Sequence, residues 1–239
     1  MAKATPLHST AKKRSVLLVD DHPIVLEGLK QLIEQQSDLN VCGELADGRA
    51  TLQTVERLRP NLVIIDISLK AVNGLDVIKA LKAQYPDLPV LALSMHDETL
   101  YAERALRAGA NGYVMKQEAT KNLLNAVRWI LGGAIYLSES MTAKLLSRMA
   151  NFKAGAKRSE LEGLSDRELE VFQLIGQGAS TRRIAEMLSL SIKTIESHRE
   201  NIKRKLKLQD AAELVQHAIS WHQSEALPKN KKATGTEPL

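Results

Sequence analysis

The first half of the chain alternates short apolar segments with stretches whose apolar residues recur every three or four positions. Five segments rich in Val, Ile and Leu are predicted to be strands: 16–20, 40–42, 62–66, 90–94 and 112–116. Helices are predicted between and after them, over 24–35, 48–58, 74–84, 98–108 and 121–131. Four of the strands are apolar almost throughout, which is typical of strands buried on both faces of a parallel sheet. The pattern predicts a doubly wound (βα)5 domain.

The second half is predicted to be helical throughout. A short helix over 142–149 precedes a basic linker, and four further helices are expected over 165–175, 180–188, 191–206 and 210–221. Ser165 and Glu168 have the spacing of a capping box at the start of the first of these four. The predicted organisation is a basic disordered tail over 1–14, an α/β domain over 15–137, a linker over 138–160, a helical domain over 161–222 and a disordered tail over 223–239.

The composition excludes several classes of protein. Of the 239 residues, 44% are hydrophobic and 3% aromatic, which predicts cores built from aliphatic side chains. The single cysteine, Cys42, cannot close an intrachain disulfide or contribute to a multi-cysteine metal site. Apolar stretches such as 16–19 and 62–65 end at aspartates, far short of the ~20 residues that a membrane span needs. The aspartates after the first run also argue against a signal peptide, so we expect a cytoplasmic protein.

The charge is distributed unevenly along the chain. The formal net charge is +5, yet residues 16–150 are slightly acidic and residues 151–239 are basic. The segment 193–207 carries six basic residues against Glu196 and Glu200. This asymmetry favours a switch domain joined to a domain that binds a polyanion, with a solvated charged helix face as the alternative.

Polar residues follow or end four of the predicted strands. They are Asp20 with Asp21, Asp66, Ser94 and Lys116. In a parallel sheet the carboxyl ends of the strands form one edge, where the functional crevice lies, so these side chains should converge. Three crowded carboxylates repel one another unless a cation joins them, and their hard oxygens are the ligands that Mg²⁺ takes.

A lysine and a hydroxyl beside such a site suit a phosphoryl group. The metal and Lys116 would neutralise the charge on the transferring oxygens, Ser94 would donate a hydrogen bond, and a carboxylate would be the nucleophile. Asp66 ends the central strand and is the natural acceptor.

Residues 15–131 resemble the receiver domain of two-component response regulators, a flavodoxin-like fold. The resemblance is carried by V-L-L-V-D-D-H at 16–22, I-I-D-I-S-L-K-A-V-N-G at 64–74, A-L-S-M-H-D at 92–97 and R-A-G-A-N-G-Y-V-M-K at 107–116. It implies that Asp66 accepts a phosphoryl group from the phosphohistidine of a sensor histidine kinase.

The resemblance also implies roles for the residues around Asp66. Asp21 and Asp66 would ligate Mg²⁺ together with the backbone carbonyl of Ser68, and Asp20 would help through water. The side chains that hold the phosphoryl oxygens would be Ser94 and Lys116, and the aromatic switch residue would be Tyr113.

Two enzymatic readings of the same pocket fit less well. A haloacid-dehalogenase-type phosphatase would have a second aspartate two residues after the nucleophile, where this chain has Ser68. A dinucleotide-binding site would have a glycine-rich turn after the first strand, where Asp20, Asp21 and His22 stand. We therefore expect that the protein is not an enzyme. His22 is interpreted as a loop residue packed near the acidic pair and not as a metal ligand.

The predicted helices over 180–206 have the layout of a helix-turn-helix. On the third helix of this domain Ile192, Ile195, Ile202 and Leu206 form one apolar stripe. The opposite, outward face is polar and partly basic, and consists of Lys193, Ser197, Glu200 and Arg204, flanked by Glu196 and Asn201. His198 falls beside the stripe and is expected to be structural.

Residues 164–218 resemble the LuxR-type DNA-binding domain of NarL/FixJ response regulators. The carriers are L-S-D-R-E-L-E-V at 164–171, G-x-S-x-x-x-I-A at 178–185, L-S-x-x-T-I-E-S-H at 190–198 and N-I-K-R-K-L at 201–206. The resemblance implies that the third helix enters the major groove of double-stranded DNA and that the fourth helps to form a homodimer.

In that family the residues facing base edges would be Glu196, Ser197 and Glu200, and those placed for phosphates would be Lys193, Thr194, Lys203 and Lys205. RNA polymerase is a further candidate partner. The alternative is an output domain that binds a protein and never DNA, which the salt dependence of DNA binding would distinguish.

Overall fold

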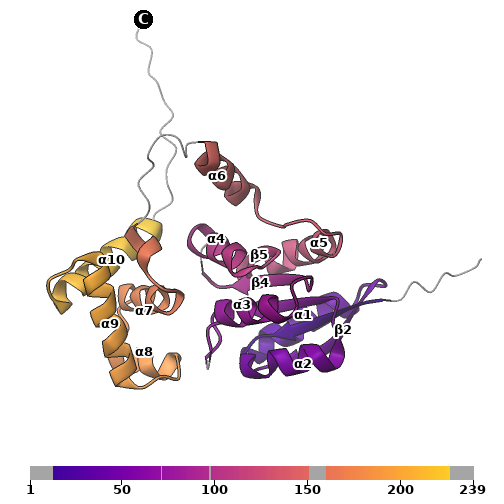
Figure 1. The fold of residues 1–239 in the computed structure, drawn as a ribbon, viewed down its shortest axis with the longest axis horizontal. Helices are drawn as coiled ribbons and strands as arrows, with labels where there is room; N and C mark the ends of the chain where they lie inside the picture. The colour runs from indigo at the N-terminus through magenta and orange to yellow at the C-terminus, as the bar shows by residue number, and fades with distance from the viewer. Residues whose placement is uncertain (1–12, 71, 97, 151–159, 227–239) are drawn as a thin grey trace, which may run out of the picture. The chain divides into compact units, whose positions relative to one another are not determined.

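The computed structural model describes residues 13–70, 72–96, 98–150 and 160–226. The chain divides into two compact units, one up to residue 157 and one from residue 158 (Figure 1). Three of the predicted segments lie wholly or largely outside the described residues, namely the two terminal tails and the basic part of the linker. None of the helices in the described ranges is long and apolar enough to cross a membrane.

The first unit is built on one parallel five-stranded sheet. Its strands are β1 (Arg14–Val19), β2 (Leu39–Leu45), β3 (Leu62–Asp66), β4 (Val90–Ser94) and β5 (Gly112–Met115), in the spatial order β2-β1-β3-β4-β5. The predicted doubly wound sheet is therefore confirmed. β2 is longer than the predicted 40–42. As an edge strand it is only half-buried, so it contains polar residues that interrupt the apolar pattern from which strands are predicted.

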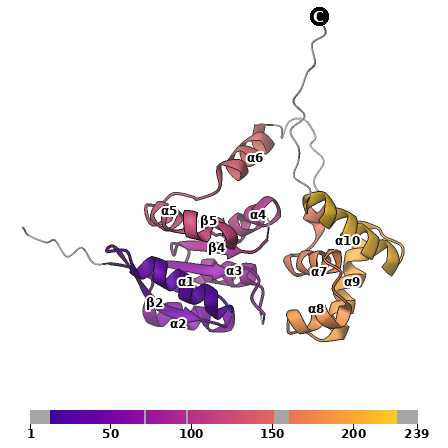
Figure 2. The same ribbon diagram turned by 180° about the vertical axis from the view of Figure 1, so that it is seen from behind.

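Helices cover both faces of this sheet (Figures 1 and 2). They are α1 (Pro23–Glu34), α2 (Thr51–Leu58), α3 (Gly74–Gln84), α4 (Glu98–Ala108) and α5 (Ala119–Leu131). On one face, Leu29 and Ile33 of α1 and Leu123 of α5 pack against strand residues such as Leu18 and Ile64. The remaining helices, α2, α3 and α4, cover the other face (Figure 1). The core is aliphatic, as the composition predicted.

The first unit ends in a segment that returns to the sheet and then in a further helix, α6 (Glu139–Ala150). Gly112 at the start of β5 forms a parallel bridge with Tyr136. The helix predicted over 142–149 begins three residues earlier, because the hydroxyl of Ser138 accepts a hydrogen bond from the Met141 amide at 3.0 Å and so caps it.

The second unit is helical throughout its described length. It contains α7 (Asp166–Gly176), α8 (Thr181–Met187), α9 (Ile192–Leu206) and α10 (Ala211–Ala226), after a short 3₁₀ turn, η4 (Glu160–Gly163). The predicted capping box of Ser165 and Glu168 is present. α10 extends to Ala226, beyond the predicted end at 221 and into the tail predicted to begin at 223.

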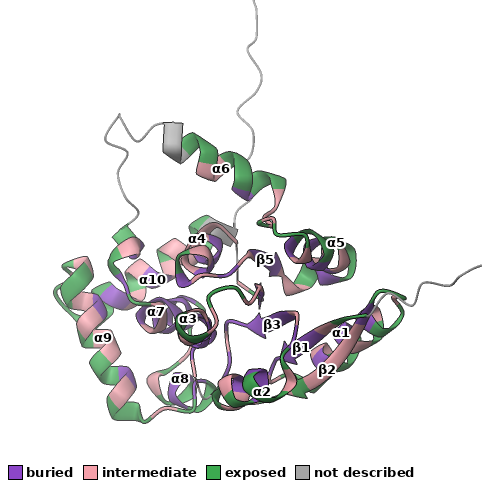
Figure 3. Cartoon of the chain, turned by 45° about the vertical axis from the view of Figure 1, so that its right-hand side comes forward, coloured by how far each residue is buried: buried purple, intermediate pink, exposed green. Residues whose placement is uncertain are grey.

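The buried residues of the second unit gather where its helices face one another (Figure 3). Phe172 of α7 is fully buried, as are Ile184 of α8, Ile195 and Ile202 of α9, and Leu214 of α10. The rings of Phe172 and Trp221 lie 5.9 Å apart. These contacts hold α9 with one face inward and the opposite face in solvent.

Candidate functional site

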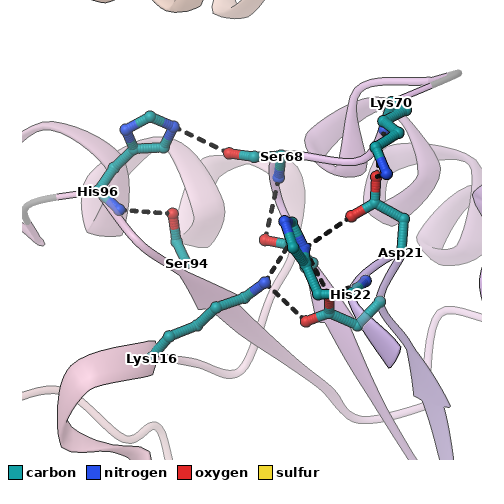
Figure 4. A network of polar contacts seen from close by, with 9 residues as sticks. Asp21, His22, Ser68, Lys70, Ser94, His96 and Lys116 are labelled. Carbon is teal, nitrogen blue, oxygen red and sulfur yellow. Dashed lines mark hydrogen bonds and ion pairs between the residues drawn. The ribbon is translucent and has the colours of Figure 1, made fainter. Parts of the chain in front are cut away.

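The polar residues that follow the strands meet at the carboxyl edge of the sheet. Asp20 follows β1, Asp66 ends β3 and Lys116 follows β5. The Lys116 Nζ atom lies 2.7 Å from Asp20 Oδ2 and 2.8 Å from Asp66 Oδ2. The structure thus brings together residues from the ends of three strands, although Asp20 and Lys116 are 96 positions apart in the sequence. The hydroxyl of Ser94, at the end of β4, is fully buried at the same edge (Figure 4).

A glycine shapes the loop after Asp66. The Gly74 amide donates to the Ile67 carbonyl at 2.8 Å, which folds the loop back onto the end of β3. A Cβ atom at position 74 would lie 2.1 Å from the backbone oxygen of Asp66, so only glycine fits there. The side chain of Asn73 then caps α3 by accepting from the Leu75 amide at 2.9 Å. This turn fixes the path of the backbone directly after Asp66.

The pocket holds more negative than positive charge. The side chains of Asp20 and Asp66 are 1% exposed and that of Asp21 is 6% exposed, while Lys116 supplies the buried ammonium. Burial raises the pKa of Asp66, Asp20 raises it further, and Lys116 works against both. Burial lowers the pKa of Lys116, but Asp66 and Asp20 outweigh this and raise it overall. Three carboxylates beside one buried ammonium remain short of positive charge, because the Lys70 ammonium, 3.6 Å from Asp21 Oδ2, is 61% exposed and screened by water.

This shortfall and the donor set fit a divalent cation. Ligand atoms of Asp20, Asp21, His22 and Asp66 lie within 4.8 Å of one another. Three of the four are carboxylate oxygens, the hard ligands that Mg²⁺ prefers. The fourth belongs to His22, whose Nδ1 lies 2.8 Å from Asp21 Oδ1 and 3.1 Å from Asp20 Oδ1. His22 therefore lies near the acidic pair, as predicted.

His96, a loop residue for which the sequence predicted no role, contacts both Ser68 and Ser94 beside the pocket (Figure 4). The His96 amide donates to Ser94 Oγ at 3.0 Å, and Tyr113 donates its hydroxyl proton to the His96 carbonyl at 2.7 Å. The His96 ring lies 2.8 Å from Ser68 Oγ and stacks on Tyr101. Burial, with the charge of Lys116, lowers the pKa of His96 to about 4, so its ring is neutral at pH 7.

Ser68 also contacts the acceptor candidate directly, since its amide donates to Asp66 Oδ1 at 3.1 Å. On the other side of the pocket, the Lys70 amide donates to Asp21 Oδ2 at 3.2 Å. These amides orient the two carboxylates. The sequence gives no signal for such bonds, because they depend on the path of the loop after β3.

In the second unit, the α9 face expected to point outward is the exposed one. Exposed residues are Lys193, Glu196, Ser197, Glu200, Arg204 and Lys205, and intermediate ones are Thr194, Asn201 and Lys203. Ile195 and Ile202 are fully buried, whereas Ile192, which was assigned to the buried stripe, is 44% exposed. Ile192 is the first residue of α9, and the side chain of a terminal residue lies at the margin of the helix contact.

Several charged residues of α9 have partners within the unit. Lys203 Nζ lies 2.8 Å from Glu200 Oε1, and Arg204 donates to Asn201 Oδ1 at 2.8 Å. Lys205 Nζ lies 2.6 Å from Oε2 of Glu168, a carboxylate that is 6% exposed. The last contact ties α9 to the capping box of α7 and was not anticipated from the sequence.

Comparisons with known proteins match both units. Residues 16–128 match the response regulator receiver domain family, and residues 162–218 match the LuxR family of bacterial regulatory proteins. The transcriptional regulatory protein DegU of Brevibacillus brevis is 32% identical over 220 residues, covering 87% of this chain and 93% of DegU. The oxygen regulatory protein NreC of Staphylococcus carnosus is 34% identical over 208 residues, covering 85% of this chain and 96% of NreC.

A solved structure agrees with this assignment. RcsB from Salmonella enterica serovar Typhimurium, bound to the promoter rprA in the presence of phosphomimetic BeF3−, has a TM-score of 0.58 and 30% sequence identity, covering 87% of this chain and 99% of RcsB. Sequence, fold and site agree: the chain belongs to the response regulators that join a receiver domain to a LuxR-type domain and act as phosphorylation-dependent, DNA-binding regulators of transcription.

Proposed function

We propose that Asp66 is the phosphoacceptor and that its phosphorylation by a sensor histidine kinase controls dimerisation and promoter binding. The observation that carries this proposal is the position of Asp66, buried at the end of the central strand with its Oδ2 atom 2.8 Å from Lys116 Nζ. A carboxylate oxygen of Asp66 forms the bond to phosphorus while the P–N bond of the phosphohistidine breaks, and the imidazole keeps the electron pair.

The residues that would hold Mg²⁺ are Asp21, Asp66 and the backbone carbonyl of Ser68, with Asp20 acting through water. When bound, the ion supplies the positive charge that three carboxylates and a phosphoryl group require. The amide of Ser68 keeps one oxygen of Asp66 oriented, since it donates to Oδ1 at 3.1 Å. With Ser68 where a phosphatase would need a second acid, the proposal is a phosphorylated switch and not an enzyme that turns over phosphate esters.

Two side chains are proposed to hold the phosphoryl oxygens. The Lys116 ammonium already lies between Asp20 and Asp66 and can follow the new negative charge. Ser94 Oγ accepts from the His96 amide, which leaves its own proton to donate to a phosphoryl oxygen. Tyr113 is the proposed switch residue, because its hydroxyl is bonded to the same loop through the His96 carbonyl.

For the second unit we propose that α9 enters the major groove of double-stranded DNA. Base edges would be read by Glu196, Ser197 and Glu200, flanked by Asn201 and Arg204, and phosphates would be contacted by Lys193, Thr194, Lys203 and Lys205. The exposure of this face supports the assignment. In this arrangement the Lys205 ammonium would contact both a DNA phosphate and the Glu168 carboxylate.

The remaining parts of the proposal concern the assembly in the cell. The receiver domain would span 15–137 and the DNA-binding domain 161–222, with a homodimer forming on phosphorylation. The proposed location is the cytoplasm, and RNA polymerase is a proposed further partner. The matched ranges 16–128 and 162–218 support the two domains of this proposal.

Phosphoryl incorporation into Asp66→Asn tests the proposal, with Asp76→Asn as the matched control. Asp76 is an exposed carboxylate on α3 that pairs with Lys79 at 3.0 Å and lies outside the pocket. With Mg²⁺ and acetyl phosphate, the wild type and Asp76→Asn should incorporate phosphate and bind promoter DNA more tightly, whereas Asp66→Asn should do neither. Labelling of Asp66→Asn at the wild-type level would contradict the assignment.

A further inference from the structure

The segment after α5 runs beside the edge strand β5. The Tyr136 amide donates to the Asn111 carbonyl at 2.9 Å, and the Tyr136 carbonyl accepts from the Tyr113 amide at 3.1 Å. Tyr113 is the residue whose hydroxyl bonds to the loop after β4. We call residues 134–141 the strap. Its first contact is therefore made to the backbone of the proposed switch residue.

The sequence of β5 is adapted to this contact. Gly112 lies opposite Tyr136 in the bridge. A Cβ atom at position 112 would lie 2.8 Å from the Tyr136 carbonyl oxygen and 3.1 Å from its Cβ atom. Any larger residue would push the strap off the sheet edge, so the close approach depends on glycine.

The strap ends on α4, at the start of α6. Ser138 donates its hydroxyl proton to Glu98 Oε1 at 2.7 Å, and Glu98 is the first residue of α4. The same hydroxyl oxygen accepts from the Met141 amide and caps α6. Met141 itself is 1% exposed, and α6 packs against α4. A single serine thus joins the beginning of α6 to the beginning of α4.

The beginning of α4 is in turn connected to the phosphorylation pocket. Glu98 follows two residues after His96, whose amide bonds to Ser94 Oγ and whose carbonyl accepts from the Tyr113 hydroxyl. A reorientation of the Ser94 hydroxyl toward a phosphoryl group breaks its bond with the His96 amide and moves the loop that precedes Glu98. Both ends of the strap are therefore attached to groups that respond to the state of Asp66.

We infer that the strap transmits the state of the phosphorylation pocket to α6, the last described helix before the segment joining the two units. The inference rests on the proposed function of Asp66. In the unphosphorylated protein, the Ser138–Glu98 hydrogen bond and the Tyr136 bridge hold the start of α6 against the receiver. When the loop after β4 moves toward the phosphoryl group, Glu98 leaves Ser138, and the first turn of α6 is released.

Hydrogen exchange on the full-length protein tests this inference through position 98. Glu98→Ala removes the contact without touching the cap of α6, whereas Glu98→Gln keeps an oxygen that can accept from Ser138. Glu103→Ala, on the same helix, controls for the loss of a carboxylate elsewhere on α4. In the unphosphorylated protein we expect the Met141 and Thr142 amides to exchange about tenfold faster in Glu98→Ala, and within about twofold of the wild type in both controls.

The response to acetyl phosphate and Mg²⁺ gives the second readout. Phosphorylation should accelerate exchange of these two amides about tenfold in the wild type and leave them unchanged in Glu98→Ala, where they are already fast. Phosphate on Asp66 is measured in the same samples, so a wild type that takes up no phosphate would refute the proposed function separately. Two results would overturn the inference. One is an exchange rate of the Met141 and Thr142 amides that does not change when Asp66 is phosphorylated. The other is an equal exchange rate of these amides in Glu98→Ala and Glu98→Gln.

Discussion

Replacing Lys205 with methionine should destabilise the second unit while its fold persists. The variant keeps the aliphatic stem and removes the ammonium that lies 2.6 Å from Glu168 Oε2. A hydrogen bond to a charged group contributes about 1.5–3 kcal/mol, and the lower end applies because the Lys205 side chain is 36% exposed and partly screened by water. For a domain of this size a loss of about 1.5 kcal/mol lowers Tm by roughly 6–12 °C.

Urea unfolding measured by Trp221 fluorescence reports on this unit, since Trp221 packs near Phe172 in its core. Trp129 lies in the first unit and is 59% exposed, so a Trp129→Phe background removes its signal with little effect on packing. Lys193→Met is the matched control, because Lys193 is an exposed lysine of the same helix. Its effect should stay within about 0.5 kcal/mol.

The pH dependence follows from the carboxylate partner. Burial raises the pKa of Glu168, but hydrogen bonds from Lys205 and Ser165 outweigh burial and lower the pKa below its ordinary value of 4.5. A lowered folded-state pKa stabilises the protein above the unfolded pKa, and this stability is lost as the pH falls through the folded pKa. The difference between wild type and Lys205→Met should therefore shrink below pH 4.5. Equal stability of Lys205→Met and Lys193→Met at pH 7 would refute the reasoning.

Three further predictions concern the metal ligands, the loop after β3 and the DNA-facing helix. Asp20→Asn with Asp21→Asn should abolish Mg²⁺ binding in calorimetry without unfolding the receiver, because removing two carboxylates relieves repulsion in the pocket. Gly74→Ala should destabilise the receiver by about 3 kcal/mol or more in urea unfolding, since its Cβ would lie 2.1 Å from the Asp66 carbonyl oxygen. Glu200→Ala should relax base preference by about 1–3 kcal/mol in titrations of specific against scrambled duplexes, and equal effects on both duplexes would contradict a reading role.

The convergence of the phosphorylation pocket could be predicted because it follows from topology alone. In a parallel sheet every strand delivers its carboxyl end to the same edge, whatever path the connections take. The three buried strands were enough to predict that Asp66, Ser94 and Lys116 lie at one edge of the sheet, because each residue ends or follows one of these strands. The outward face of α9 was predictable for a similar reason, since a helix of known bounds fixes which residues share a side.

Contacts made by loops and between helices could not be predicted in this way. The Ser68–His96 contact depends on the conformations of two loops, and the Lys205–Glu168 pair depends on how α7 and α9 cross. Neither leaves a periodic signal in the sequence. The exposure of Ile192 is a smaller example, because a helical stripe does not show where the neighbouring helix ends.

The bridge between Tyr136 and β5 also has a consequence for solubility. β5 is an edge strand, and an uncovered edge is a template on which another strand can add. In this chain the strap hydrogen-bonds the Asn111 carbonyl and the Tyr113 amide, so these two groups are not available to pair with a strand of another molecule. A receiver fragment cut at Leu131, where α5 ends, would expose these groups, and a well-behaved isolated domain should extend at least through Ser138.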